Sequence, residues 1–412
     1  MSSVYRKVAG IDVHKKVLYV VIGEQECGRG KRRRFGATRS ELARLGDWLA
    51  AEEVDTVVME STAQYWKPVW MALEQRFRLL LAQAGSNPAP YGRKSDFADA
   101  ERLIKRLSSD ELRLSFVPEA EQRDWRLLTR TRVQYSRNII ALRNRLEGLL
   151  EECQIKLSSL LSDLLGATGR RILRALAAGE TDAQKLADLR VGRLQASKQE
   201  FWQALQGELR PACRLLLAQY LEQLDAAERQ IEQLDRELSS MLRQYQDTIV
   251  RLCEMPGVAL SAAEQIIAEV GPVAAKFPTP GHLASWVGAC PGRQESAGKS
   301  TNDACPKGNR YMRRIINQCA WAAVRTKNSY FESLFRRLTP RLGVKKALWA
   351  VAHRFLRILW RILHEGDRYQ ERGLLPQPPK LLERRFRRLA RDLTALGYHI
   401  QLVPPTPNQL PS

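Results

Sequence analysis

Acidic residues are scarce in this chain relative to basic ones, and long apolar runs and cysteine pairs are missing altogether. No stretch of about 18 apolar residues occurs, so we expect no membrane-spanning helix. Met1-Ser-Ser-Val-Tyr leads directly into a predicted strand without a signal peptide. The seven cysteines form no CxxC pair, which argues against a zinc ribbon and a disulfide framework. These absences favour a cytoplasmic protein with reduced thiols.

The excess of positive charge indicates a polyanionic partner. Lys and Arg total 66 against 45 Asp and Glu, which gives a formal net charge of +21 over 412 residues. DNA or RNA is the simplest such partner. A basic ribosome-associated or membrane-surface protein is the alternative, because net charge alone does not identify a partner. The length indicates two or three domains.

The first part of the chain alternates between strand and helix patterns. Thr38 and Glu41 form a capping-box pattern at the start of one helix. The basic run 31–34 is expected to precede a third strand. The remaining expected elements are strands at 8–13, 17–22, 55–60 and 78–83, and helices at 38–51, 64–76 and 94–107. This alternation predicts an α/β layered domain over residues 1–115.

The rest of the chain reads as mainly helical. Residues 116–249 are Leu-rich and charged, and four consecutive heptads carry apolar residues at their a and d positions: Leu217, Tyr220, Leu224, Ala227, Ile231, Leu234, Leu238 and Met241. This pattern predicts a coiled coil, with an amphipathic helix packed inside its own domain as the alternative. A mainly α domain is expected over 250–372, followed by a basic helix and a Pro-rich, disordered tail over 373–412.

Four carboxylates stand out in the first domain. Asp12 and Glu60 end predicted strands, and Asp96 and Asp99 share one face of a predicted helix. Phosphodiester chemistry can use Mg²⁺, which prefers such hard oxygen ligands. Each acid taken alone also fits a turn or a helix dipole. The four together, in this order, predict a metal site of the ribonuclease-H-like kind. His14, beside Asp12, is predicted to be a surface turn residue, with contact to a phosphate or water as the alternative.

Two segments of the C-terminal part suggest phosphate contacts. Residues 255–271, with Gly257 in a Pro-Gly turn, resemble a helix-hairpin-helix, and a plain helical packing unit is the alternative. A Gly-bearing loop then carries Ser296, whose hydroxyl is a candidate nucleophile; a phosphate-contact loop with an ordinary serine is the simpler reading. The basic or polar residues expected to contact nucleic acid here are Arg293, Lys299, Lys307, Asn309, Arg310, Arg313 and Arg314.

Together these segments resemble the DEDD-type insertion-sequence transposases, a family described as bridge-RNA-guided DNA recombinases. The resemblance covers roughly residues 8–107 and 250–370. It is carried by Gly10-Ile-Asp12-Val-His-Lys, Met59-Glu60-Ser-Thr, Lys94-Ser-Asp96-Phe-Ala-Asp99-Ala, Met255-Pro-Gly, the segment from Trp286 to Lys299, and Lys307-Gly-Asn-Arg-Tyr-Met-Arg-Arg.

The resemblance implies a RuvC-like (ribonuclease-H-like) α/β domain, then a helical coiled-coil region and a mainly α C-terminal domain. It implies Asp12, Glu60, Asp96 and Asp99 as ligands of Mg²⁺, with Mn²⁺ as a substitute. The nucleophile would be Ser296 by its position in Glu-Ser-Ala-Gly-Lys. Ser300 is the alternative, because Ala297 stands where relatives commonly have glycine.

The resemblance also implies partners. These are donor and target DNA, a structured guide RNA encoded by the element, and further copies of the chain in a dimer or tetramer. The place of action would be the bacterial cytoplasm, at the nucleoid. Two other functions fit the residues: a Mg²⁺-dependent structure-specific nuclease or Holliday-junction resolvase, and a non-catalytic basic scaffold that binds nucleic acid.

Overall fold

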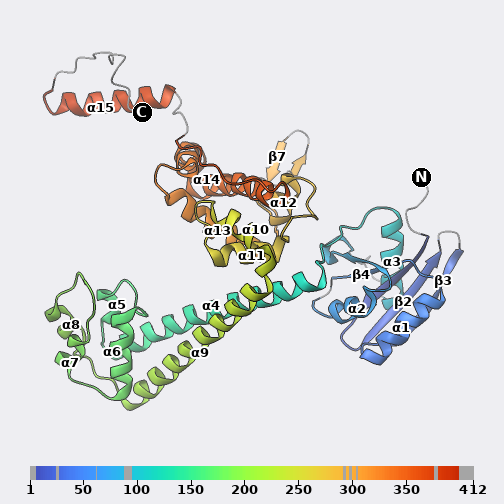
Figure 1. The fold of residues 1–412 in the computed structure, drawn as a ribbon, viewed down its shortest axis with the longest axis horizontal. Coiled ribbons are helices and arrows are strands. Elements are labelled where there is room, and N and C mark those ends of the chain that lie inside the picture. Colours follow the sequence, from blue (N-terminus) through green and yellow to red (C-terminus); the bar gives the residue numbers. More distant parts are fainter. Residues whose placement is uncertain are drawn as a thin grey trace. The chain divides into compact units, whose positions relative to one another are not determined.

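The computed structural model describes residues 6–24, 27–61, 63–87, 95–290, 294–296, 299–302, 305–374 and 379–398. The chain divides into two compact units, Met1–Glu119 and Ala120–Ser412, which Figure 1 shows coloured along the sequence. No helix among the described residues is both long enough and apolar enough to span a bilayer.

The first unit is built on a mixed five-stranded sheet. Its strands are β1 (Lys7–Val13), β2 (Val17–Glu24), β3 (Cys27–Gly36), β4 (Thr56–Glu60) and β5 (Arg78–Ala82), in the spatial order β3-β2-β1-β4-β5. The pairs β1–β2 and β2–β3 are antiparallel, whereas β4 runs parallel to both β1 and β5. The sheet and its helices confirm the predicted ribonuclease-H-like α/β fold.

Helices cover both faces of this sheet. The helices α1 (Arg39–Ala51) and α2 (Trp66–Leu73) share one apolar core with the sheet, and α3 (Asp96–Ser108) shares another. Successive strand residues point to opposite faces, so Val57 and Met59 join the first core while Val58 joins the second. The central strands are therefore buried on both sides, as their nearly continuous apolar sequence requires.

The basic run 31–34 lies inside β3 and does not precede it. The prediction was wrong because β3 is an edge strand, which tolerates charged side chains on both faces. Lys31 pairs with Glu52 (Nζ–Oε2 2.6 Å), and Arg32 donates from Nε to Glu101 Oε1 at 3.0 Å. The charged edge is thereby tied to the helices on either face.

Gly10 sets how closely α3 approaches the sheet. A Cβ at Gly10 would lie 2.2 Å from the carbonyl oxygen of Ala100 and 3.0 Å from Cγ1 of Ile104. We therefore expect Gly10→Ala to push α3 outward and to lower the free energy of unfolding by about 1–3 kcal/mol. Gly85→Ala is the matched control, because nothing lies within 4 Å of its Cβ position. Equal melting temperatures for both variants would contradict this packing.

The second unit begins with two long helices, α4 (Ala120–Glu152) and α9 (Pro211–Met241), which pack against each other in opposite directions. Arg132 on α4 pairs with Asp235 near the end of α9. Leu146 on α4 and Leu217 on α9 share one buried cluster. The short helices α5 (Leu157–Leu160), α6 (Ala167–Ala178), α7 (Ala183–Asp188) and α8 (Lys198–Ala204) complete that cluster.

The apolar heptad positions of α9 thus pack against α4 and other helices of the same chain. Leu217, Leu224 and Leu238, all at a positions, are buried. The pair of α4 and α9 therefore fits the alternative prediction, an amphipathic helix packed inside its own domain. Pairing between copies of the chain stays a prediction, as do the predicted boundaries after residues 115, 249 and 372.

The remaining elements are mainly helical. They are α10 (Gln246–Cys253), α11 (Leu260–Val270), α12 (Pro280–Val287), the two-stranded ribbon of β6 (Gln294–Ser296) and β7 (Lys299–Asn302), α13 (Arg310–Arg325), α14 (Tyr330–His364) and α15 (Pro379–Ala395). The short 3-10 turns η1 (Ala84–Ser86) and η2 (Arg243–Tyr245) precede α3 and α10. Helix α14 is kinked at Gly343, whose φ is 72°. This confirms a mainly helical region after the α/β unit.

Candidate active site

The four predicted acids stand on three elements of the first unit. Asp12 is the penultimate residue of β1, and Glu60 is the last residue of β4, which runs parallel to β1. Asp96 and Asp99 occupy the first turn of α3, where the Ser95 side chain accepts a hydrogen bond from the Ala98 amide at 3.3 Å. The carboxyl ends of neighbouring parallel strands and a helix N-terminus therefore supply the acids.

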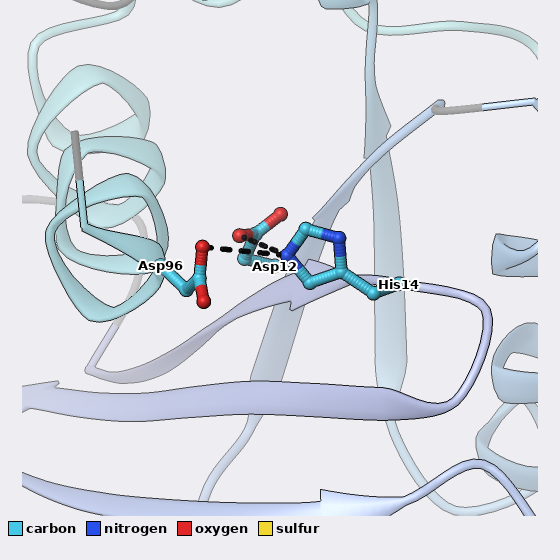
Figure 2. A group of neighbouring side chains, drawn as sticks. All are labelled: Asp12, His14 and Asp96. Carbon is cyan, nitrogen blue, oxygen red and sulfur yellow. Dashed lines mark ion pairs between the residues drawn. The ribbon is translucent and has the colours of Figure 1, made fainter.

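Asp12, His14 and Asp96 point toward one another (Figure 2). His14 Nε2 lies 3.1 Å from Asp12 Oδ2 and 3.5 Å from Asp96 Oδ1. One donor atom from each residue falls within 4.8 Å of the other two. Nε2 is buried but makes no hydrogen bond of good geometry among the described residues. Two carboxylates and an unsatisfied ring nitrogen around one point form a donor set that suits a divalent cation.

Aromatic rings hold the imidazole in place. The ring of Tyr19 meets that of His14 edge-on, with centroids 5.9 Å apart, and Phe97 packs edge-on against Tyr19 at 5.1 Å. His14 therefore belongs to the acidic group, whereas its sequence position read as a surface turn. Its spacing from Asp12, two residues on at the end of a strand, was the available signal.

Two residues not singled out in the sequence tie the other two acids together. Asn87 is buried, donates from Nδ2 to Glu60 Oε2 at 2.9 Å and accepts from Arg102 Nε at 3.2 Å. Arg102 also pairs with the carboxylate of Asp99. This chain of contacts fixes the orientation of Glu60 and Asp99 relative to each other.

The other three acids act electrostatically on Asp12. The pKa of Asp12 is raised, first by burial and then by the negative charges of Asp99, Asp96 and Glu60, while the neighbouring His14 opposes the rise. Charge repulsion of this kind is relieved by a bound cation. The electrostatics and the donor atoms of Asp12, His14 and Asp96 thus both fit a divalent metal between the end of β1 and the start of α3.

The predicted nucleophile lies in the ribbon of β6 and β7. In this ladder Ser296 pairs with Lys299, and Glu295 pairs with Ser300. Arg293 lies outside the described residues, and so do the side chains of Ser296, Lys299 and Ser300. The structure gives their strand pairing, and their roles stay predictions.

The base of this loop is built from residues expected to contact nucleic acid. The Asn309 side chain caps α13 by accepting from the amides of Tyr311 (3.0 Å) and Met312 (2.9 Å), and donates to buried Glu269 at 3.0 Å. Arg313 donates to the carbonyl oxygens of Gly288 and Pro306. Arg313 thus joins the two ends of the loop, and Asn309 connects the start of α13 to α11.

The other predicted contact residues differ in their surroundings. Gly257 has φ 85°, and a Cβ there would lie 2.5 Å from the Cys319 carbonyl oxygen, so it lets the turn before α11 pack on α13. Arg314 is half-buried, and burial followed by the charges of Arg137 and Arg132 lowers its pKa. Lys307 and Arg310 are exposed. Their contacts with nucleic acid stay predictions.

The chain has a ribonuclease-H-like sheet with clustered acids, followed by a helical unit. Together with two family matches, this architecture defines the chain as a transposase, a DNA phosphoryl-transfer enzyme. Residues 9–155 match a DEDD transposase family model of the IS110 group, and residues 250–336 match the model described as Transposase IS116/IS110/IS902 family. The chain belongs to the IS110/IS1111 family of insertion-sequence transposases.

Individual relatives agree with this assignment. The chain is 25% identical to the transposase for insertion sequence element IS1111A of Coxiella burnetii over 372 residues, which cover 88% of this chain and 91% of that protein. It is also 27% identical to an uncharacterized 43.6 kDa protein of insertion element IS110 in Streptomyces coelicolor, over 150 residues and 36% of each chain. The resemblance noted in the sequence is thereby confirmed.

Proposed function

We propose that this transposase moves its insertion sequence by a metal-assisted serine-recombinase reaction. Asp12, Glu60, Asp96 and Asp99 would hold Mg²⁺, or Mn²⁺ in its place, and Ser296 would be the nucleophile. The observation that carries the proposal is the mutual approach of Asp12, His14 and Asp96, with the His14 Nε2 atom left without a hydrogen bond. His14 is an additional donor at this centre.

Each step of the proposed chemistry forms one bond from oxygen to phosphorus and breaks another. Ser296 Oγ bonds to the phosphorus of the scissile phosphate, the bond from phosphorus to one sugar oxygen breaks, and the serine proton ends on the released hydroxyl. The DNA end stays joined to the protein until the hydroxyl of the exchanged strand attacks in reverse. Bound Mg²⁺ would supply charge neutralisation and polarisation at the phosphate. Lys299, Arg293 and the other basic residues of the loop would stabilise the developing negative charge.

The partners follow from the same proposal. A structured RNA from the element would select donor and target DNA by base pairing, so the protein would need backbone and shape contacts only. The net charge of +21 supports such contacts, and the proposed nucleic-acid contacts are Gly257, Lys307, Asn309, Arg310, Arg313 and Arg314 beside the loop residues. A dimer or tetramer acting on DNA at the bacterial nucleoid, in the cytoplasm, would allow the acids of one copy to work with the serine of another.

The metal site can be tested without measuring activity. Mg²⁺ at a hundredfold excess over its dissociation constant is expected to stabilise the unit that binds it by about 2.7 kcal/mol. The measurement is the rise in melting temperature when Mg²⁺ is added. Asp96→Asn should remove most of this rise. Asp47→Asn is the control, because Asp47 is an exposed aspartate of the same unit that pairs with Arg76. An equal Mg²⁺ response in all three proteins would place the metal elsewhere.

A further inference from the structure

A positively charged site lies on α14, in the second unit. Arg354, Arg357, Arg361 and Arg372 line a cavity of about 150 Å³ together with Tyr330. The first three follow one another at helical spacing and so share one face of α14, while the fourth comes from the segment after that helix. We call this cavity the arginine pocket.

The segment that carries Arg372 is anchored in place. Glu371 accepts hydrogen bonds from the backbone amide of Tyr330 at 2.8 Å and from the Tyr369 hydroxyl at 2.9 Å. The ring of Tyr369 stacks on that of Phe331, with centroids 6.2 Å apart. These contacts fold the segment back onto α14. Arg372 is therefore held beside three other guanidinium groups, although their repulsion opposes this position.

Only part of this charge is balanced within the protein. Arg361 pairs with Glu365 at 3.0 Å and also with Asp367. Arg354 donates from Nε to the neutral hydroxyl of Tyr330 at 3.1 Å.

Arg357 and Arg372 differ from Arg361. Both are exposed, and neither has a carboxylate partner in the part of the chain that the structure describes. Their charge is therefore available to an anion that enters the pocket. Guanidinium groups bind phosphate oxygens through paired N–H donors.

The pocket lies apart from the serine loop. Pro280, which also lines it, begins α12. The loop that carries Ser296 follows the other end of that helix, at Val287. Seven residue steps of α-helix separate the two ends by about 10 Å. A ligand in the pocket would therefore contact the protein beyond the loop.

We propose that the arginine pocket binds a backbone phosphate of a nucleic acid strand, apart from the loop that carries Ser296. The ligand class follows from the unbalanced guanidinium groups, and from DNA being the substrate of a transposase. Both DNA and RNA present this phosphate. The pocket would fix the path of the strand relative to α12 and the loop that follows it.

Salt dependence of binding by the full chain tests the proposal. Labelled duplex DNA and labelled single-stranded RNA are titrated by fluorescence anisotropy, from about 50 to 300 mM salt. Arg357→Gln and Arg372→Gln are each expected to weaken binding by about fivefold near 0.15 M salt. Each should also reduce the slope of log K against log salt by about 0.9 for duplex DNA, or about 0.7 for a single strand. A loss with one probe alone would identify which nucleic acid occupies the pocket.

Arg341→Gln is the matched control. It removes the same charge from the same helix at an exposed arginine outside the pocket. If this variant loses as much affinity as Arg357→Gln and Arg372→Gln with both probes, the effect is one of net charge and the pocket proposal fails. Unchanged binding in both pocket variants would also overturn it.

For Glu371→Ala, general electrostatics and the pocket proposal predict opposite changes in nucleic-acid affinity. This variant raises the net positive charge, so general electrostatics predicts tighter binding to nucleic acid. The pocket predicts weaker binding, because Arg372 loses the anchor that holds it beside α14. Melting temperatures of all variants identify any that fail to fold. Tighter binding by a folded Glu371→Ala protein would contradict the proposal.

Discussion

Asp12→Asn is expected to lower DNA strand cleavage by at least about 10³-fold, or roughly 4 kcal/mol of transition-state stabilisation, while DNA binding is retained. Asp12 contacts His14 and lies near Asp96, and the negative charges of Glu60 and Asp99 raise its pKa. Its loss therefore removes the proposed metal ligand at the middle of the acidic group. The measurement is the cleavage rate of labelled element-end DNA with Mg²⁺ and the flanking RNA present.

The same variant is expected to have normal or increased stability without metal. The raised pKa of Asp12 means that folding disfavours its ionised form. This penalty is present at neutral pH and disappears as the pH falls below the ordinary value of 3.8, where the carboxyl is protonated in both states. Asparagine carries no such penalty. Cleavage that survives in stably folded Asp12→Asn, at the level of Asp47→Asn, would exclude Asp12 from the chemistry.

Ser296→Ala is expected to reduce excision of the element by at least about 10⁴-fold, since loss of a covalent nucleophile leaves only the remaining binding and electrostatic contributions. Ser300→Ala is the matched control from the facing strand, where Ser300 pairs with Glu295. It should excise at close to the wild-type rate. Excision is measured in cells from the rejoined donor junction, with the flanking RNA co-expressed.

The two serine variants also separate the alternatives. If Ser300→Ala loses excision and Ser296→Ala keeps it, the nucleophile is Ser300. If both variants still cut DNA in a Mg²⁺-dependent manner, water is the nucleophile and the resolvase function is favoured. If cutting never occurs while binding persists in all variants, the scaffold function is favoured.

The acids were predictable because strand order and helix spacing place them. Asp12 and Glu60 stand at the carboxyl ends of neighbouring parallel strands, and Asp96 and Asp99 share the first turn of one helix. Their supports were not predictable. Asn87 reaches both Glu60 and Arg102 from a connecting segment whose path no periodic pattern specifies.

Charge and heptad patterns were less informative than the strand pattern. The run 31–34 has no apolar alternation, so its place in β3 depends on pairing with β2 and on carboxylates from two helices. The heptads of α9 identify an apolar seam but not its partner. In the structure that partner is α4. It ends at Glu152, 59 residues before α9 begins at Pro211.

Covalent capture of DNA tests the central claim most directly. Purified protein with the flanking RNA, Mg²⁺ and labelled element-end DNA is denatured and resolved on a gel, with wild type beside Ser296→Ala and Asp12→Asn. The account predicts a DNA-linked protein band in the wild type that both variants lack. Cleaved DNA without linked protein in the wild type, or a linked band that persists in Ser296→Ala, would contradict it.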